Sequence, residues 1–250
     1  MIKTSMKRRV NRRDAIGMLG AAGLALAAGC GSSPTTPTTT TTTGSGSSGS
    51  GGASGGTTGT SSCAVSPEET AGPYPDHTGM LNNPAFFRQD ITEGKNGLPL
   101  TLILTIVNSN AQCAPLTNAN VEIWQCDAAG NYSEYGSQAS QTFLRGLQTT
   151  DTNGVVTFRT IYPGWYQGRA THIHVQVFVN GAVVKTTQIA FPEDVSSTVY
   201  QTGVYAAHGQ NATSNSRDNV FADGVDHELA SLSGSAAGGY TGTLTIGVSV

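Results

Sequence analysis

Two histidines separated by a single residue, His172 and His174, are the part of this chain best suited to metal chemistry. Successive side chains of a β-strand point to opposite faces, so both imidazoles would leave one face while Ile173 points into the core. Tyr166 lies shortly before the pair, and Tyr132 lies further upstream. Phenolate is a hard, anionic oxygen donor, and ligand type selects metals more than raw affinity does. Two histidines and two tyrosines together indicate a ferric iron site.

Two other interpretations of these residues stay open. Histidines on a strand often form a solvated or hydrogen-bonded face, and a non-catalytic extracellular β-sandwich that acts as a binding module would need no metal. If a metal binds, zinc is a common occupant, with three protein ligands and one open position. A zinc hydrolase would take its third ligand from a histidine such as His208 or His227.

A longer ordered set of residues surrounds the pair. It consists of WQCDAAGNY at 124–132, YPGWYQGRATHIH at 162–174, Thr187-Gln188, and the flanking segments SPEETAGPY at 66–74, RQDI at 88–91 and AFP at 190–192. This set resembles the intradiol ring-cleavage dioxygenases, the family of catechol and protocatechuate dioxygenases, and it is most similar to their short, exported members. The resemblance covers most of the chain after residue 62.

The resemblance implies a role for each site residue. It assigns four ligands to one ferric ion, Fe3+: Tyr132, Tyr166, His172 and His174. Tyr166 also matches the tyrosinate that leaves the metal and accepts a proton from the substrate. Arg169 matches an arginine that stabilises negative charge on the substrate, and Gln188 matches a glutamine near the substrate.

The implied reaction is oxygen-dependent ring cleavage. A catechol-type substrate is opened between its two hydroxyl-bearing carbons, and both atoms of O2 enter a cis,cis-muconate-type diacid. The stretch from Tyr166 to His172 is shorter than in the well-known catabolic enzymes, which removes loop that would line the substrate pocket. The identity of the catechol therefore stays open.

The first sixty or so residues are not expected to be part of the folded domain, and their beginning predicts export of the protein. Six basic residues precede the apolar stretch 15–28, and Gly29 and Cys30 follow it. That order is typical of a signal peptide, and Arg12-Arg13 is similar to a twin-arginine signal. Cys30 resembles the lipid-modified cysteine of a lipoprotein, although Ala27 stands where leucine is usual; cleavage to a soluble secreted protein is the alternative. Residues 1–30 are thus expected to be the export signal, which places the protein in the cell envelope, the periplasm or outside the cell.

Composition separates a linker from a folded domain. Between residues 31 and 62 every residue except Ala53 is Gly, Ser, Thr or Pro, which favours a disordered spacer. The expected catalytic domain is 63–250. After Cys30 the chain has seven basic and fifteen acidic residues, a net charge of about −8. Nucleic acid is therefore a poor partner, because it binds to basic surfaces. The few charges are scattered, so only a lipid at Cys30 would hold the protein to a membrane.

Three cysteines follow the signal, namely Cys63, Cys113 and Cys126. In an exported protein two of them can pair, and sequence alone does not determine which. Cys126 lies close to the proposed ligand Tyr132, so we favour Cys63 with Cys113 and a free buried Cys126.

Period-two alternation predicts an all-β fold. Leucine or isoleucine at 100, 102, 104 and 106 alternates with Thr101 and Thr105, as in a half-buried strand. Further strands are expected at 120–126, 143–149, 155–161, 171–179, 182–191 and 241–250, with turns at 127–130, 151–154 and Asn180-Gly181. Seven short strands predict a two-sheet β-sandwich with long loops and one or two short helices, one of them within 194–207.

Overall fold

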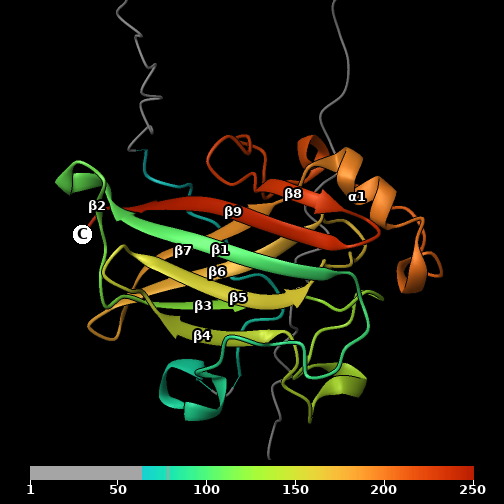
Figure 1. The fold of residues 1–250 in the computed structure, drawn as a ribbon, viewed down its shortest axis with the longest axis horizontal. Coiled ribbons are helices and arrows are strands. Elements are labelled where there is room, and N and C mark those ends of the chain that lie inside the picture. Colours follow the sequence, from blue (N-terminus) through green and yellow to red (C-terminus); the bar gives the residue numbers. More distant parts are fainter. Residues whose placement is uncertain (1–63, 78) are drawn as a thin grey trace, which may run out of the picture. The chain divides into compact units, whose positions relative to one another are not determined.

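The computed structural model describes residues 64–77 and 79–250 (Figure 1). The predicted export signal, the linker and Cys63 lie outside the described residues. Within the part that is described, no helix has the length and apolar character needed to cross a membrane.

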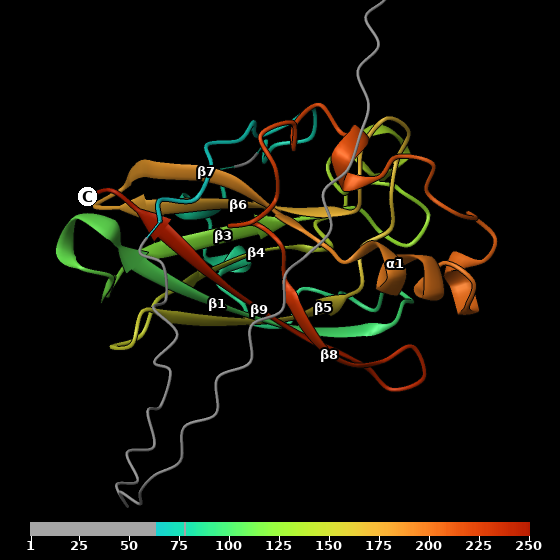
Figure 2. The ribbon, with the colours of Figure 1, turned by 90° about the horizontal axis from the view of Figure 1, so that it is seen from above.

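Nine strands in the described part of the chain form two sheets. They are β1 (Pro99–Asn108), β2 (Ala114–Pro115), β3 (Asn120–Trp124), β4 (Arg145–Thr149), β5 (Val155–Ile161), β6 (His172–Val179), β7 (Ala182–Ala190), β8 (Ser231–Ser235) and β9 (Gly239–Val248). One sheet has the order β2-β1-β9-β8, with β5 also paired to β1, and the other has the order β4-β3-β6-β7. The pairs are antiparallel except β1 with β9, which is parallel. Figure 2 shows the two sheets as separate layers, so the predicted β-sandwich is confirmed.

The core between the layers comes from the alternation seen in the sequence. Leu102 and Leu104 of β1 are fully buried, as are Ile173 and Val175 of β6, and all belong to one hydrophobic cluster. Burial of each such side chain stabilises the fold by ~1.5–3 kcal/mol. The row of β6 that begins with Ile173 therefore faces this core, and the row that begins with His172 faces away from it.

The strand predictions hold within about two residues at most ends, and two strands were missed. β8 has the sequence SLSGS and is mostly exposed, so it carries no alternation of apolar and polar residues. β2 is only two residues long. The helix expected within 194–207 is present as α1 (Glu193–Val199), followed by a 3-10 turn at Gly203–Tyr205.

The expected turns also form. Asn180 and Gly181 join β6 to β7 with φ values of 51° and 80°, the left-handed conformation that a two-residue hairpin of this type needs. In the turn after β4, the Asp151 carboxylate accepts hydrogen bonds from the backbone N–H groups of Asn153 and Val155, both at 2.8 Å.

The two cysteines in the described part of the chain have the bonding states that the sequence predicted. Cys113 is disulfide-bonded, and Cys126 is free and buried. The predicted partner of Cys113, Cys63, lies outside the described residues, so that pairing stays a prediction.

A second, smaller cluster covers the outer face of the sheet β4-β3-β6-β7. Its buried members are Met80, Phe86, Trp124, Cys126, Tyr132 and Leu147. Ala71 and Tyr74, from the segment that precedes β1, pack against it. In Figure 2 this first described segment, in cyan, runs along the outer side of β6 and β7. The outer face of this sheet is thus covered by chain, and it is the face from which His172 and His174 project.

Candidate metal centre

The two histidines of β6 lie side by side on this covered face. The distance between His172 Nε2 and His174 Nε2 is 3.1 Å, and both residues are buried. His172 Nδ1 donates to the carbonyl oxygen of Ala170 at 2.7 Å, which leaves Nε2 with the lone pair. The ring of Trp124, opposite His174 on β3, stacks on His174 with centroids 4.7 Å apart and planes 3° from parallel. Neighbouring groups therefore hold both imidazoles in place.

Electrostatics keep these imidazoles neutral. Burial, assisted by the positive charge of Arg169, lowers the pKa of His172 to about 3. Burial and the neighbouring His172 lower the pKa of His174 well below its ordinary value. Neutral imidazole is the form that binds a metal ion, so no proton has to be removed from either ring.

Two tight turns bring the tyrosines to the histidines. A Cβ atom at Gly130, where φ is +82°, would collide with the backbone oxygen of Trp165, and one at Gly164 would collide with that of Asp127. Glycine at both positions lets the turn after β3 pack directly on the segment before β6. Tyr132 and Tyr166 follow these turns, and their ring centroids are 5.8 Å apart.

The two phenols differ in their surroundings. Tyr166 is partly exposed, and its Oη lies 3.4 Å from His172 Nε2. Tyr132 is 3% exposed, and its Oη finds no hydrogen-bond partner within 64–77 and 79–250. Burying a hydroxyl without a partner costs roughly 1–3 kcal/mol. A metal ion bound by Tyr132 Oη would remove that cost.

The donor set fits ferric iron. Two neutral imidazoles lie beside two phenol rings: Tyr166 Oη is 3.4 Å from His172 Nε2, and the ring centroids of Tyr132 and His174 are 6.2 Å apart. No group of three His, Cys, Asp or Glu side chains that could hold a metal exists in the described residues. Burial raises the pKa of both tyrosines, so a metal must displace their protons, which requires a strongly acidic ion.

The third zinc ligand suggested by the sequence is not at this site. His208 Nε2 lies 2.8 Å from the backbone oxygen of Trp165, and His227 is exposed. Neither ring contacts His172 or His174 in any hydrogen bond or ring contact of the described chain.

Arg169 lies beside the candidate ligands and is held on two sides. Its Nε donates to both carboxylate oxygens of Asp218, at 3.0 and 2.8 Å, and its Nη2 donates to Gln188 Oε1 at 2.5 Å. Its Nη1 lies 3.4 Å from Tyr166 Oη and 3.5 Å from His172 Nε2. The guanidinium therefore presents one nitrogen to the place where the four candidate ligands meet.

The six site residues predicted from the sequence thus come together, and the structure adds others. Asp218 was missed because nothing distinguishes one carboxylate in a loop 49 residues from Arg169. Tyr74 was missed as well; its ring stacks on Tyr132 with centroids 4.5 Å apart. The segment SPEETAGPY, which ends at Tyr74, was the available signal.

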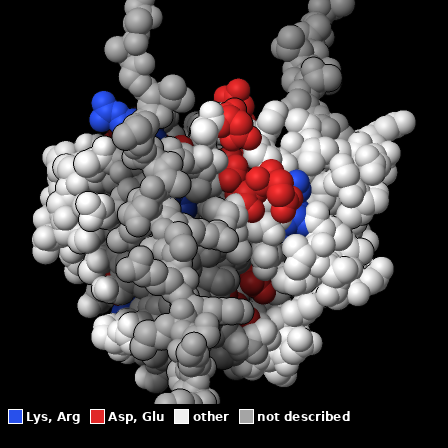
Figure 3. Space-filling view, turned by 180° about the vertical axis from the view of Figure 1, so that it is seen from behind, with Lys and Arg blue, Asp and Glu red and all other residues white. Residues whose placement is uncertain are grey.

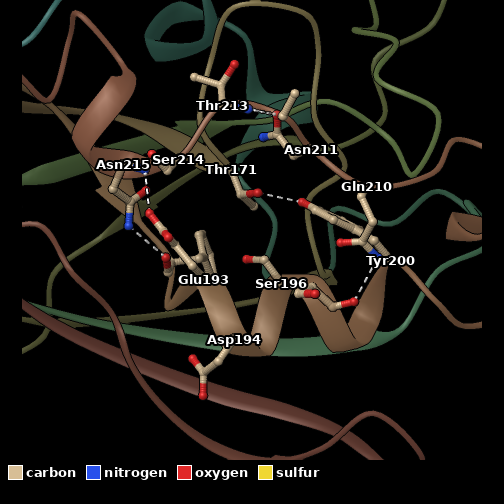
Figure 4. Close-up of a pocket in the computed structure, with 13 residues that line it drawn as sticks. Thr171, Glu193, Asp194, Ser196, Tyr200, Gln210, Asn211, Thr213, Ser214 and Asn215 are labelled. Atoms are coloured by element: carbon tan, nitrogen blue, oxygen red, sulfur yellow. Dashed lines mark hydrogen bonds between the residues drawn. The ribbon is translucent and has the colours of Figure 1, made fainter.

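Two cavities differ in their relation to this site. A small one of about 160 Å³ is lined by Tyr74, Tyr132 and Tyr135, so one candidate ligand, Tyr132, forms part of its wall. Another, of about 340 Å³, lies between α1 and the loop 210–215 (Figure 4) and contains none of the candidate ligands. Its polar groups are largely paired with one another, as in the 2.6 Å hydrogen bond between Thr171 and Tyr200.

Comparison with known proteins agrees with this geometry. A family model described as dioxygenase matches residues 71–219. Catechol 1,2-dioxygenase of Acinetobacter baylyi is 29% identical over 170 residues, which cover 60% of this chain and 50% of that protein. The protocatechuate 3,4-dioxygenase beta chain of Burkholderia cepacia is 33% identical over 123 residues, 42% of this chain and 52% of that one. The chain thus spans about half the length of these relatives.

Solved structures match over more of their length. An intradiol ring-cleavage dioxygenase from Tetranychus urticae has a TM-score of 0.65 and 30% identity, covering 75% of this chain and 95% of that one. The dioxygenase domain of a dioxygenase and carbohydrate-binding fusion from Streptomyces sp. SirexAA-E has a TM-score of 0.56 and 28% identity, covering 75% and 99%. The chain therefore belongs to the intradiol ring-cleavage dioxygenase family.

Proposed function

We propose that this protein is a non-haem ferric iron dioxygenase that opens a catechol-type ring between its two hydroxyl-bearing carbons and yields a cis,cis-muconate-type diacid. The observation that carries the proposal is that two imidazoles and two phenol rings lie side by side. The Nε2 atoms of His172 and His174 lie 3.1 Å apart, and two phenols stand beside them, one with its Oη buried and unpartnered.

The two tyrosines would divide the work. Bound iron supplies a Lewis acid that draws electron density from the substrate. Tyr132 is buried and stays in place, whereas Tyr166 is partly exposed and can be reached by a substrate hydroxyl. Tyr166 Oη would therefore accept the substrate proton. Arg169 Nη1, 3.4 Å from that oxygen, favours its charged form and would stabilise the substrate oxygens.

Gln188 would hold the side chain of Arg169 against the strand β7 by a hydrogen bond. Its side-chain oxygen accepts from Arg169 at 2.5 Å, and its amide nitrogen donates to the backbone oxygen of Thr70 at 2.9 Å. Because Gln188 lies opposite His174 in the β6–β7 register, it connects the arginine to the strand that carries the histidines. This connection supports a single orientation of the guanidinium.

The charge around Arg169 favours a substrate without an anionic substituent. Asp218 already pairs with the guanidinium. Burial, together with the negative charges of Asp223, Asp218 and Glu68, raises the pKa of Glu69 to about 7 against the opposite effect of Arg169. Figure 3, the view from behind, shows acidic side chains gathered near the middle of the picture. A ring carboxylate would meet these negative charges, so we propose a neutral catechol as substrate.

The test is product analysis with isotopically labelled oxygen. Protein loaded with ferric iron should convert catechol to a diacid that contains both atoms of one O2 molecule. His174→Ala should abolish this conversion, and the matched control His227→Ala, at an exposed histidine, should not. A semialdehyde product, from cleavage outside the two hydroxyl-bearing carbons, or no oxygen uptake would contradict the proposal. A binding module would bind without turnover.

We also propose that the protein is exported by the twin-arginine route and tethered by a lipid at Cys30. Support comes from the basic, apolar and small-residue order of residues 1–30 and from the spacer that follows. Mass spectrometry of the mature amino terminus distinguishes acylated Cys30 from simple cleavage. An unprocessed Met1 would contradict both forms.

A further inference from the structure

A buried carboxylate outside the predicted site residues makes the strongest contacts with Arg169. Asp218 lies in the loop that follows the 3-10 turn Asn215–Arg217, and its side chain is fully buried. Both of its oxygens accept from Arg169 Nε, and one of them also accepts from the backbone N–H of Ala170 at 2.7 Å. The other accepts from the N–H of Val220 at 2.9 Å. The carboxylate thus joins this loop to the residues directly before β6.

These contacts determine which nitrogen of the guanidinium is free. The donors of an arginine have a fixed planar arrangement. Asp218 occupies Nε and Gln188 occupies Nη2, so Nη1 is the nitrogen left to face Tyr166 Oη and His172 Nε2. Without Asp218 the long side chain would regain freedom at Nε, and the direction of Nη1 would rest on Gln188 alone.

The pairing also sets the charge of the pocket. An unpaired Arg169 would present a full positive charge to the substrate, and such a charge attracts any anion. With Asp218 beside it, the pair is close to neutral overall, while Nη1 keeps its N–H groups for oxygen atoms. The buried partner therefore lets the arginine act as a directed donor.

We propose that Asp218 is a positioning residue for the ring-opening reaction, acting on the substrate only through Arg169. The inference rests on the proposed function where it concerns turnover. The orientation of Arg169 by Asp218 is independent of that function and can be measured without any substrate.

The first experiment measures the orientation directly. Phenylglyoxal modifies unpaired arginines, and the rate at Arg169 can be followed by peptide mass spectrometry. Asp218→Asn keeps the shape of the side chain and removes the charge, so labelling of Arg169 should become at least several-fold faster. Asp226→Asn, the same change at an exposed residue eight positions on, should leave the rate as in the wild type. Equal labelling rates in all three proteins would overturn the proposal, whatever reaction the protein catalyses.

The second experiment is a double-mutant cycle on iron-loaded protein. Asp218→Asn should retain iron and the visible absorption, and its kcat for catechol should fall ~10-fold or more, since misplacing a catalytic group by about 1 Å can cost ~10²-fold. Added to Arg169→Gln, the same change should lower kcat by no more than about twofold, because the group through which it acts is already gone.

The cycle also separates positioning from a purely structural role. The double variant removes both charges of the pair, so it stays testable even if Asp218→Asn alone folds poorly. Independent losses that multiply in the double variant would show that Asp218 acts by another route, and the proposal would be wrong. A wild-type protein that holds iron but cleaves no catechol would instead refute the proposed function and leave the labelling result standing.

Discussion

Replacing Tyr132 by phenylalanine should change the stability of this protein in opposite directions with and without iron. In the metal-free protein the variant loses a hydroxyl that is buried and has no partner in the described chain. Removing such a group should stabilise the fold by about 1–2 kcal/mol. For a domain of this size, that free energy raises the Tm by roughly 2–8 °C.

With ferric iron present the sign should reverse. Iron at 1,000 times its Kd stabilises the wild type by ~4 kcal/mol. A site that binds iron roughly 100-fold more weakly loses about 2.7 kcal/mol of this, more than the gain from the missing hydroxyl. The assay is thermal unfolding of both proteins, with a chelator and with ferric iron. The matched control is Tyr205→Phe, because Tyr205 Oη donates to the backbone oxygen of Tyr162 at 2.6 Å and its loss should destabilise the fold in both conditions.

Either of two outcomes would refute this reasoning. If Tyr132→Phe lowers the Tm of the metal-free protein as Tyr205→Phe does, the hydroxyl has a partner that the site geometry does not account for. If the variant gains as much Tm from iron as the wild type does, Tyr132 is not a ligand.

Four further predictions concern Arg169, the charge around it, Glu228 and the disulfide at Cys113. Arg169→Gln should keep iron and lower kcat by ~10²-fold, measured by catechol turnover; a change in KM alone would mean uniform binding only. Catechol should have a kcat/KM at least ~10-fold above that of 3,4-dihydroxybenzoate, and Glu69→Gln should reduce this difference in kcat/KM between the two substrates. A preference for the carboxylated ring would contradict the charge argument. Burial raises the pKa of Glu228 from 4.5 to about 7, so the folded state binds more protons than the unfolded state between these pH values, and stability falls as pH rises through them. Glu228→Gln should therefore raise the urea midpoint of unfolding at pH 8 and leave it unchanged at pH 4. An equal effect at both pH values would count against this prediction. Mild reduction of the disulfide at Cys113 should leave iron bound, as judged by the visible absorption.

Local patterns in the sequence were sufficient for most of the fold. The alternation in β1 and β6 is a property of consecutive residues, so the strands and the buried row of β6 could be predicted without knowing their partners. β8 could not, because SLSGS forms a strand through its pairing with β9 and not through its own composition.

Some of the site residues could likewise be predicted from local sequence patterns, and others depend on three-dimensional packing. His172 and His174 could be placed on one face from spacing alone. Residue type made Tyr132 and Tyr166 candidates, and the family resemblance assigned them to the same iron. Spacing could not bring them together, because the close approach at Gly130 and Gly164 depends on three-dimensional packing. Asp218 could not be predicted because its role comes from a contact across 49 residues.

Metal analysis of the purified protein, combined with its visible spectrum, tests the central claim most directly. The four-ligand site predicts one ferric ion per chain and a red-brown tyrosinate-to-iron absorption that disappears in Tyr132→Phe. A colourless protein that holds zinc, or that takes up no metal when offered ferric iron, would contradict it.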